Sequence, residues 1–147
     1  MSAASESATL AKIRRVVAVL ASVTALGGLV ELAMLRHWDG IQLVPWFVLS
    51  LVAVVGVVTA GGGPARLAWA TGVLGLLGGA LGVWQHVAAN HALGPRVAEY
   101  AQTWDSMSVL ERYWLAGTGA VGAAPALAPG MLALAGVLLI VAVLDRR

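Results

Sequence analysis

The stretch TGVLGLLGGALGVWQH, residues 71–86, carries a regular pattern of glycines inside a long apolar run. The glycines recur at alternating steps of three and four residues, which places Gly72, Gly75, Gly79 and Gly82 on one face of a helix. His86 continues the same face. Small residues at this spacing let membrane helices approach closely. The stretch therefore predicts a membrane helix that packs tightly on a neighbouring helix.

The composition of the whole chain predicts an integral membrane protein. The chain has 147 residues, of which 60% are hydrophobic and 11% are charged, and its mean hydropathy is +0.88. A helix that spans a bilayer needs about 20 apolar residues. Apolar runs of about this length occupy residues 13–35, 43–60, 66–87 and 127–144. We therefore expect an all-α membrane protein, a four-transmembrane-helix bundle. The fourth span has two possible starts, near Val109 and near Leu127.

The N-terminal end divides into a polar tail and the first apolar run. We expect residues 1–12 to form a disordered cytoplasmic tail and residues 13–147 to form the four-helix transmembrane domain. KIRRVVAVLASVTALGG, residues 12–28, also fits a secretory signal, because a basic region precedes an apolar region with small residues. The apolar run continues to a full spanning length, however, which favours a membrane helix.

Lys and Arg predict the orientation, because cytoplasmic loops are enriched in them. In a four-span chain six of these residues share one side and three share the other: Lys12, Arg14, Arg15, Arg66, Arg146 and Arg147 against Arg36, Arg96 and Arg112. We therefore expect a multi-pass protein of the inner membrane with both termini in the cytoplasm. The expected partners are the lipid bilayer and a second copy or another membrane protein. A formal charge of only +2 excludes a basic patch for nucleic acid.

This orientation places several polar residues at the extracytoplasmic face. LRHWDGIQLVPW, residues 35–46, connects the first two spans, and His86 and Asn90 lie near the outer end of the third. Glu31 lies about one turn inside the first span. An ionisable group there costs about 2.5–3.5 kcal/mol and normally faces a partner or a wet cavity. We expect the first and third spans to pack through their small residues, bringing Glu31 near His86.

The segment between the third and fourth spans predicts two further helices. Apolar residues from Val97 to Met107 recur at helical spacing with polar residues between them, which predicts an extracytoplasmic interfacial helix over the polar pocket. SVLE, residues 108–111, is typical of a capping box at the start of a helix. Pro125 and Pro129 interrupt that helix before the last span.

Three strings of this chain resemble a known group of proteins. They are ELAMLRHWDGIQLVP from Glu31, GVWQHVAAN from Gly82, and PALAPGMLALAG from Pro125. Together they resemble a family of small four-span bacterial integral membrane proteins whose activity is uncharacterised. The most specific parts are the His-x-acid-x-x-Gln-x-x-Pro and Pro-Ala-Leu-Ala-Pro-Gly strings. The resemblance implies a four-span fold with a polar pocket and implies no activity.

Two ligand-binding functions fit the polar pocket. The first is a divalent metal site, because imidazole and carboxylate ligands suit zinc, copper, iron or manganese. Its candidate ligands are Glu31, His37, Asp39 and His86, with His91 as a further one, and Gln42 and Asn90 would orient them. The second is a b-type haem between His37 and His86.

The third hypothesis is a structural or partner-binding bundle, in which the polar residues tie helix ends together by hydrogen bonds. The sequence favours this interpretation, because no close ligand spacing such as His-x-x-His supports a metal site. Cysteine is absent, which excludes disulfides and thiolate metal sites. The sequence also lacks a nucleophile elbow, a phosphate loop and paired internal carboxylates, so it argues against an enzyme.

Overall fold

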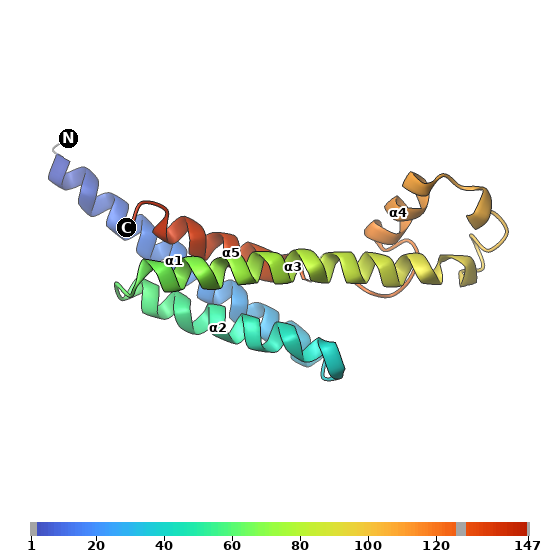
Figure 1. Ribbon diagram of the computed structural model, residues 1–147, viewed down its shortest axis with the longest axis horizontal. Helices are drawn as coiled ribbons and strands as arrows, with labels where there is room; N and C mark the ends of the chain where they lie inside the picture. The colour runs from blue at the N-terminus through green and yellow to red at the C-terminus, as the bar shows by residue number, and fades with distance from the viewer. Residues whose placement is uncertain (1–2, 126–128, 147) are drawn as a thin grey trace. The chain divides into compact units, whose positions relative to one another are not determined.

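The computed structural model describes residues 3–125 and 129–146, and within these ranges the chain is helical and contains no strand (Figure 1). The α-helices are α1 (Ala3–Met34), α2 (Leu43–Ala60), α3 (Ala65–Leu93), α4 (Val109–Thr118) and α5 (Gly130–Val143). Three short 3-10 helices lie between them: η1 (Gly40–Gln42), η2 (Gly94–Arg96) and η3 (Trp104–Ser106). The all-helical class predicted from the sequence is confirmed.

Three helical segments are long and apolar enough to cross a membrane: Glu6–Met34, Gly40–Ala60 and Ala65–Arg96. The fourth apolar helix, α5, is shorter, with 14 residues. The start that we expected near Leu127 lies outside the described residues. The other start, Val109, begins the separate helix α4. The residues that the structure describes therefore contain three membrane-capable helices and a shorter apolar one.

The chain forms two compact units. The first unit contains Met1–Gly79 and Met131–Arg147, and the second contains Ala80–Gly130. Helix α3 contributes its first half to the first unit and its second half to the second unit.

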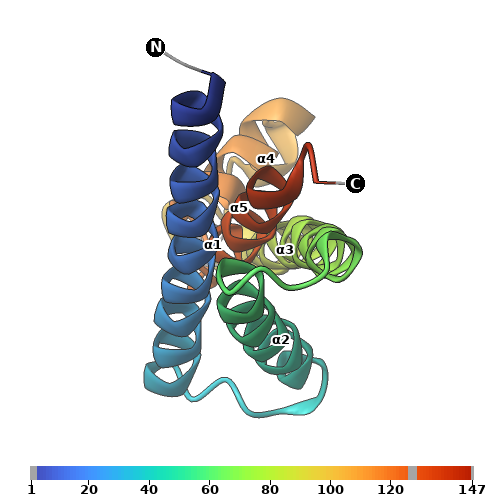
Figure 2. The same ribbon diagram turned by 90° about the vertical axis from the view of Figure 1, so that its left-hand side faces the viewer.

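Small residues let α1 and α2 approach each other within the first unit (Figure 2). Ala18 and Ala21 of α1 are fully buried. The Ser22 hydroxyl donates a hydrogen bond to the carbonyl oxygen of Ala53 on α2, at 2.8 Å. A side chain at Gly56 of α2 would collide with the Ser22 hydroxyl and would lie 2.8 Å from the carbonyl oxygen of Ala18. The backbones of the two helices are therefore close enough to exclude even a methyl group.

The glycine stripe of α3 packs on α5, which is also in the first unit. A Cβ at Gly72 would lie 2.7 Å from the carbonyl oxygen of Gly136, and one at Gly79 would lie 2.7 Å from the Cβ of Ala133. The glycines of α1, Gly27 and Gly28, have different neighbours. A Cβ at Gly28 would meet Leu49 of α2, and one at Gly27 would have nothing within 4 Å. The expected packing of the first and third spans through these faces is therefore wrong. The small residues of α5 allow the close approach instead.

The described part of the polar tail is helical. Helix α1 begins at Ala3, so residues 3–12 continue the helix where we expected disorder, and residues 1 and 2 lie outside the described residues. Glu6 lies in the first turn of α1, where a negative charge interacts favourably with the helix dipole.

The segment 97–107 of the second unit is not the continuous interfacial helix that its spacing predicts. It consists of successive turns followed by η3. The carbonyl oxygen of Val97 accepts hydrogen bonds from the amides of Tyr100 and Ala101, and that of Tyr100 accepts from Thr103 and Trp104. Trp104 is buried, and it reaches its buried position from a series of turns instead of one continuous helix.

The capping box predicted at the start of α4 is confirmed. The Ser108 hydroxyl accepts a hydrogen bond from the amide of Glu111, and the Glu111 carboxylate accepts one from the amide of Ser108.

The contact between α3 and α5 predicts a strong effect of one methyl group. Gly79→Ala should lower the free energy of unfolding by about 1–3 kcal/mol, because overpacking forces the two backbones apart. Gly27→Ala is the matched control, since it adds the same methyl group to a helix in open space, where alanine is the better helix former by about 1 kcal/mol. Thermal unfolding in detergent measures both variants. Equal stability of the two would contradict the close contact.

Candidate functional site

Asn90 is the central polar residue of the second unit. It lies near the end of α3, and none of its surface is exposed. Its side-chain amide donates to the carbonyl oxygens of Ala116 on α4, at 3.0 Å, and of Ala124, at 2.8 Å. Its side-chain oxygen accepts from the amide of Ala124 at 3.0 Å. One side chain thus joins the end of α3 to α4 and to the segment that follows α4.

Gly122 makes room for this arrangement. Its φ is +78°, a conformation that favours glycine, and a side chain there would collide with the side-chain oxygen of Asn90. His86, one turn before Asn90, adds a bond to the same segment, because its Nδ1 lies 3.0 Å from the carbonyl oxygen of Pro125. A carbonyl oxygen only accepts hydrogen bonds, so Nδ1 carries the proton and donates it. His86 and Asn90 therefore hold the same segment.

An aromatic cluster lies beside Asn90. The ring of His91 stacks on Tyr113 of α4 with a centroid distance of 4.6 Å, and it meets the edge of Trp104 at 5.4 Å. Trp84 lies parallel to Tyr113 at 6.1 Å. A side chain at Gly94 would collide with the Trp104 ring. Sequence reasoning missed this cluster, although Trp84 and His91 are seven residues apart and therefore share one face of α3.

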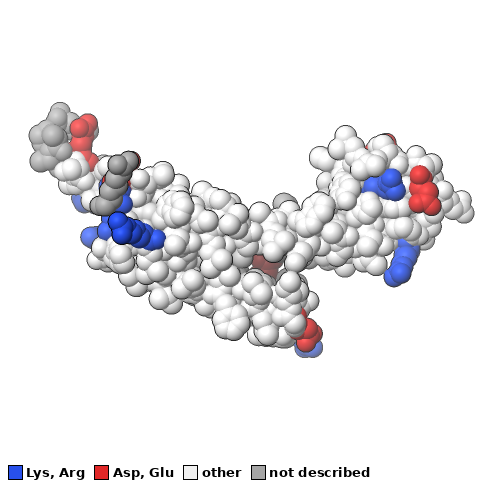
Figure 3. All heavy atoms as spheres, in the orientation of Figure 1, with Lys and Arg blue, Asp and Glu red and all other residues white. Residues whose placement is uncertain are grey.

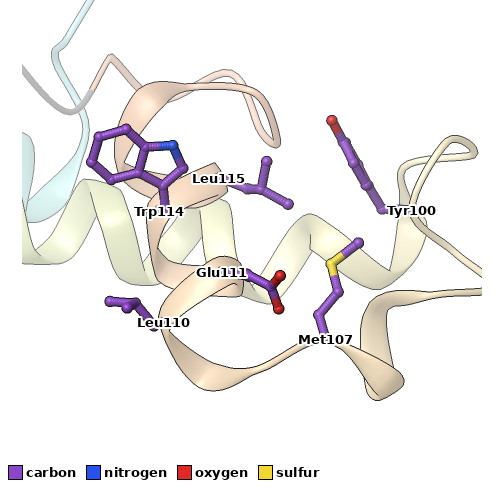
Figure 4. Close-up of a pocket in the computed structure, with 6 residues that line it drawn as sticks. All are labelled: Tyr100, Met107, Leu110, Glu111, Trp114 and Leu115. Atoms are coloured by element: carbon purple, nitrogen blue, oxygen red, sulfur yellow. The ribbon is translucent and has the colours of Figure 1, made fainter.

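A largely apolar groove of about 630 Å³ lies on the α4 side of the second unit (Figure 4). Its lining residues are Tyr100, Met107, Leu110, Glu111, Trp114 and Leu115. Leu110 and Trp114 are 79% and 70% exposed. Hydrogen bonds from the Ser108 hydroxyl and amide lower the pKa of Glu111 below its ordinary value. The groove therefore combines an apolar wall with one carboxylate that stays negatively charged at neutral pH.

The polar residues of the first connection also satisfy the backbone. The Gln42 side-chain oxygen accepts a hydrogen bond from the amide of Asp39 at 3.2 Å. The Trp46 indole donates to the carbonyl oxygen of His37 at 2.7 Å, and its ring stacks on Trp38 at 4.5 Å. These contacts fix a tight connection between α1 and α2. Gln42 therefore supports a turn, which differs from the role of orienting a metal ligand that the sequence predicts.

The structure does not support the predicted metal site. His37, Asp39 and Gln42 lie together in the first unit, where Glu31 is half-buried on α1, whereas His86 and Asn90 belong to the second unit. The proximity of Glu31 to His86, and a haem between His37 and His86, stay predictions. Among the residues that the structure describes, no group of three or more His, Asp or Glu side chains could hold a metal ion.

The hydrogen bonds of Asn90 predict that its replacement destabilises the second unit. Asn90→Ala leaves the buried carbonyl oxygen of Ala116 and the partly buried amide and carbonyl of Ala124 without this partner. A buried group that loses its partner costs about 1–3 kcal/mol. Asn90→Asp should be worse, because a carboxylate would face the carbonyl oxygens of Ala116 and Ala124. Hydrogen exchange of the Ala124 amide measures the effect directly, and its protection should fall in both variants. Gln85→Ala, an exposed change on the same helix, is the control and should stay within about 0.5 kcal/mol of the wild type. Unchanged protection of Ala124 in Asn90→Ala would refute the role of Asn90.

Comparison with known proteins identifies no relative from which a function of these sites could be taken. No protein-family model matches the chain, and neither a curated protein nor a solved structure matches it. The resemblance of the three sequence strings to small four-span bacterial membrane proteins therefore stays a prediction. The hydrogen bonds of Asn90 and His86, the aromatic cluster and the groove beside α4 are the observations from which a function follows.

Proposed function

We propose that this chain is a structural or partner-binding bundle of the inner membrane rather than an enzyme. The observation that carries this proposal is the role of Asn90, whose side chain makes three hydrogen bonds to the backbone, one to Ala116 of α4 and two to Ala124 in the segment that follows α4. A residue with this role holds a fold together. It fits a ligand-binding function less well, because its amide and its oxygen are already occupied.

The same use of polar residues recurs in the first unit. Gln42 caps the backbone at Asp39, and the Trp46 indole satisfies the carbonyl oxygen of His37. Backbone groups that leave a helix close to a bilayer must find protein partners or water, because lipid offers none. These residues therefore support the structural interpretation over the metal and haem alternatives.

The helices of the first unit expose apolar side chains that fit a bilayer. Val16, Leu20 and Val23 of α1 are each about half exposed, as are Val54 and Val57 of α2. Such faces are costly in water and favourable in hydrocarbon. We therefore propose that the lipid bilayer is the environment of α1, α2, α3 and, as a fourth and shorter span, α5.

The groove of the second unit is the surface that we assign to a protein partner. Leu110 and Trp114 provide exposed apolar area beside the charged Glu111. This combination fits an apolar segment that carries a basic residue, from another membrane protein. Aromatic side chains dominate the energetics of many protein interfaces, and a charged neighbour adds specificity.

The structural interpretation predicts that the purified protein holds no metal or haem and needs none. Elemental analysis and an absorption spectrum, after reconstitution with zinc, copper, iron or manganese, should give less than stoichiometric metal and no haem band. His86→Ala should lower the melting temperature equally with and without added metal, because its bond to Pro125 is structural. Stoichiometric metal that is lost in His86→Ala would overturn the proposal in favour of the metal site.

Cross-linking in native membranes tests the partner-binding part of the same proposal. The chain has no cysteine, so Leu110→Cys creates a single reactive site in the groove. It should give a cross-linked protein adduct that disappears when Trp114→Ala is added. Gln102→Cys, an exposed site outside the groove lining, is the control. If both sites give the same adducts, or neither gives any, the groove does not bind a partner and only the structural role stands.

The proposed orientation places both termini in the cytoplasm, and it rests on the six-to-three distribution of Lys and Arg. Asp39→Cys should react with an impermeant maleimide in intact cells, because Asp39 is exposed in the connection between α1 and α2. Gly61→Cys, between α2 and α3, should react only after the membrane is opened. Gly61 is suited to this change because it is exposed and has a φ of −78°. The reverse pattern of labelling would invert the topology.

A further inference from the structure

Three arginines surround a small pocket at one end of the first unit. The pocket has a volume of about 210 Å³, and it lies where residues of α1 meet the ends of α2 and α5. Its lining includes Arg14, Arg15 and Arg146 together with Thr59, Ala60 and Gly62. Figure 3 shows Lys and Arg side chains gathered at this end of the first unit. Segments distant in the sequence thus place three positive charges around one cavity.

Two of these arginines are held in place by the protein. Arg14 donates to the Asp145 carboxylate at 3.0 Å. Arg146 donates to the carbonyl oxygens of Gly62 and Gly63, both at 3.0 Å. Ordering a long side chain on binding costs conformational entropy. Because these bonds already order Arg14 and Arg146, a ligand that binds there loses less free energy to this cost. The pocket is therefore preorganised for an anion.

Arg15 is the arginine of the pocket whose guanidinium donors are not used within the described protein, whereas Arg14 and Arg146 donate to protein oxygens. It is exposed and lines the pocket, and its side chain makes no hydrogen bond or ion pair with any part of the chain that the structure describes. The three arginines carry three positive charges, and Asp145 offsets one of them. Asp145 is 81% exposed, so solvent screens its attraction. The pocket keeps a positive balance and a planar guanidinium that can form paired hydrogen bonds to phosphate oxygens.

The position of the pocket along the helices points to a lipid. Arg14 and Arg15 precede the apolar part of α1, Thr59 and Ala60 end α2, and Arg146 follows α5. The cavity therefore lies where the hydrocarbon-spanning segments end, which is the level of lipid phosphates in a bilayer. Exposed apolar residues continue from this level along the helices, among them Val16 and Leu20 of α1 and Val57 of α2. They offer a surface for acyl chains.

We propose that this pocket binds the phosphodiester of an anionic phospholipid, with Arg15 as the principal ligand-binding residue. Basic pockets between membrane helices on the cytoplasmic side are suited to such headgroups. The inference rests on the proposed membrane embedding and does not depend on the partner-binding groove. The orientation proposed above would place the lipid in the cytoplasmic leaflet.

Lipid binding to the full-length protein in detergent tests the proposal. The probes are short-chain phosphatidylglycerol, phosphatidylcholine and inorganic phosphate, each titrated at 150 mM salt while the melting temperature is recorded. Phosphatidylglycerol should raise the melting temperature of the wild type most. Arg15→Ala should weaken its binding about 10- to 100-fold, as expected for a lost hydrogen bond to a charged group. Arg15→Lys, which keeps the charge and loses the planar fork, should give an intermediate affinity.

Arg66→Ala is the matched control for charge. Arg66 is exposed in the first turn of α3, four residues after Gly62, and it does not line the pocket. Its replacement should change the affinity about twofold or less. Arg15 is the better test position than Arg14 or Arg146, because those two also hold the fold together through Asp145, Gly62 and Gly63.

Three results would overturn the proposal. Equal weakening by Arg15→Ala and Arg66→Ala would show that the lipid responds only to the total charge. Inorganic phosphate that stabilises the protein as strongly as phosphatidylglycerol would identify a site for free phosphate. Equal stabilisation by phosphatidylglycerol and phosphatidylcholine would show that the anionic headgroup is not recognised. Each result leaves the tests of Asn90, His86 and the groove unaffected, so the two proposals fail separately.

Discussion

Backbone amides and carbonyls that leave a helix need hydrogen-bond partners, and this need shapes both units of the protein. In water such groups are satisfied by solvent, whereas lipid hydrocarbon offers no hydrogen-bond partner and the chain itself must supply one there. Asn90 does so for Ala116 and Ala124, Gln42 does so for Asp39, and Arg146 does so for the turn after α2. Polar residues in a predominantly apolar chain are therefore used to close turns and join helix ends.

Close helix packing in the first unit follows from small residues. Ser22 and Gly56 bring α1 and α2 together, and Gly72 and Gly79 of α3 meet small residues of α5. Dispersion contacts between backbones replace the hydrophobic driving force, which is absent between helices surrounded by lipid. Because each contact excludes even one methyl group, the packing tolerates no larger side chain at these positions.

The two proposed binding surfaces have different chemistry because they serve different environments. The groove beside α4 combines exposed aromatic and aliphatic side chains with the ionised Glu111, which suits an apolar protein segment with a positive charge. The arginine pocket of the first unit combines fixed guanidinium groups with neighbouring apolar helix faces, which suits a lipid phosphate and its chains.

The sequence by itself determined the features that depend on local chemistry. Hydropathy predicted an all-helical chain with membrane-capable helices, and the SVLE string predicted the capping box at Ser108, because both act within a few residues. Tertiary structure decided which surfaces meet. The spacing of Gly72 and Gly79 predicted a close contact, but the partner proved to be α5, since any helix with small residues fits such a stripe. The roles of Asn90, His91 and the three arginines likewise depend on contacts between segments that are far apart in the sequence. The periodicity of one helix does not indicate which distant segment packs against it.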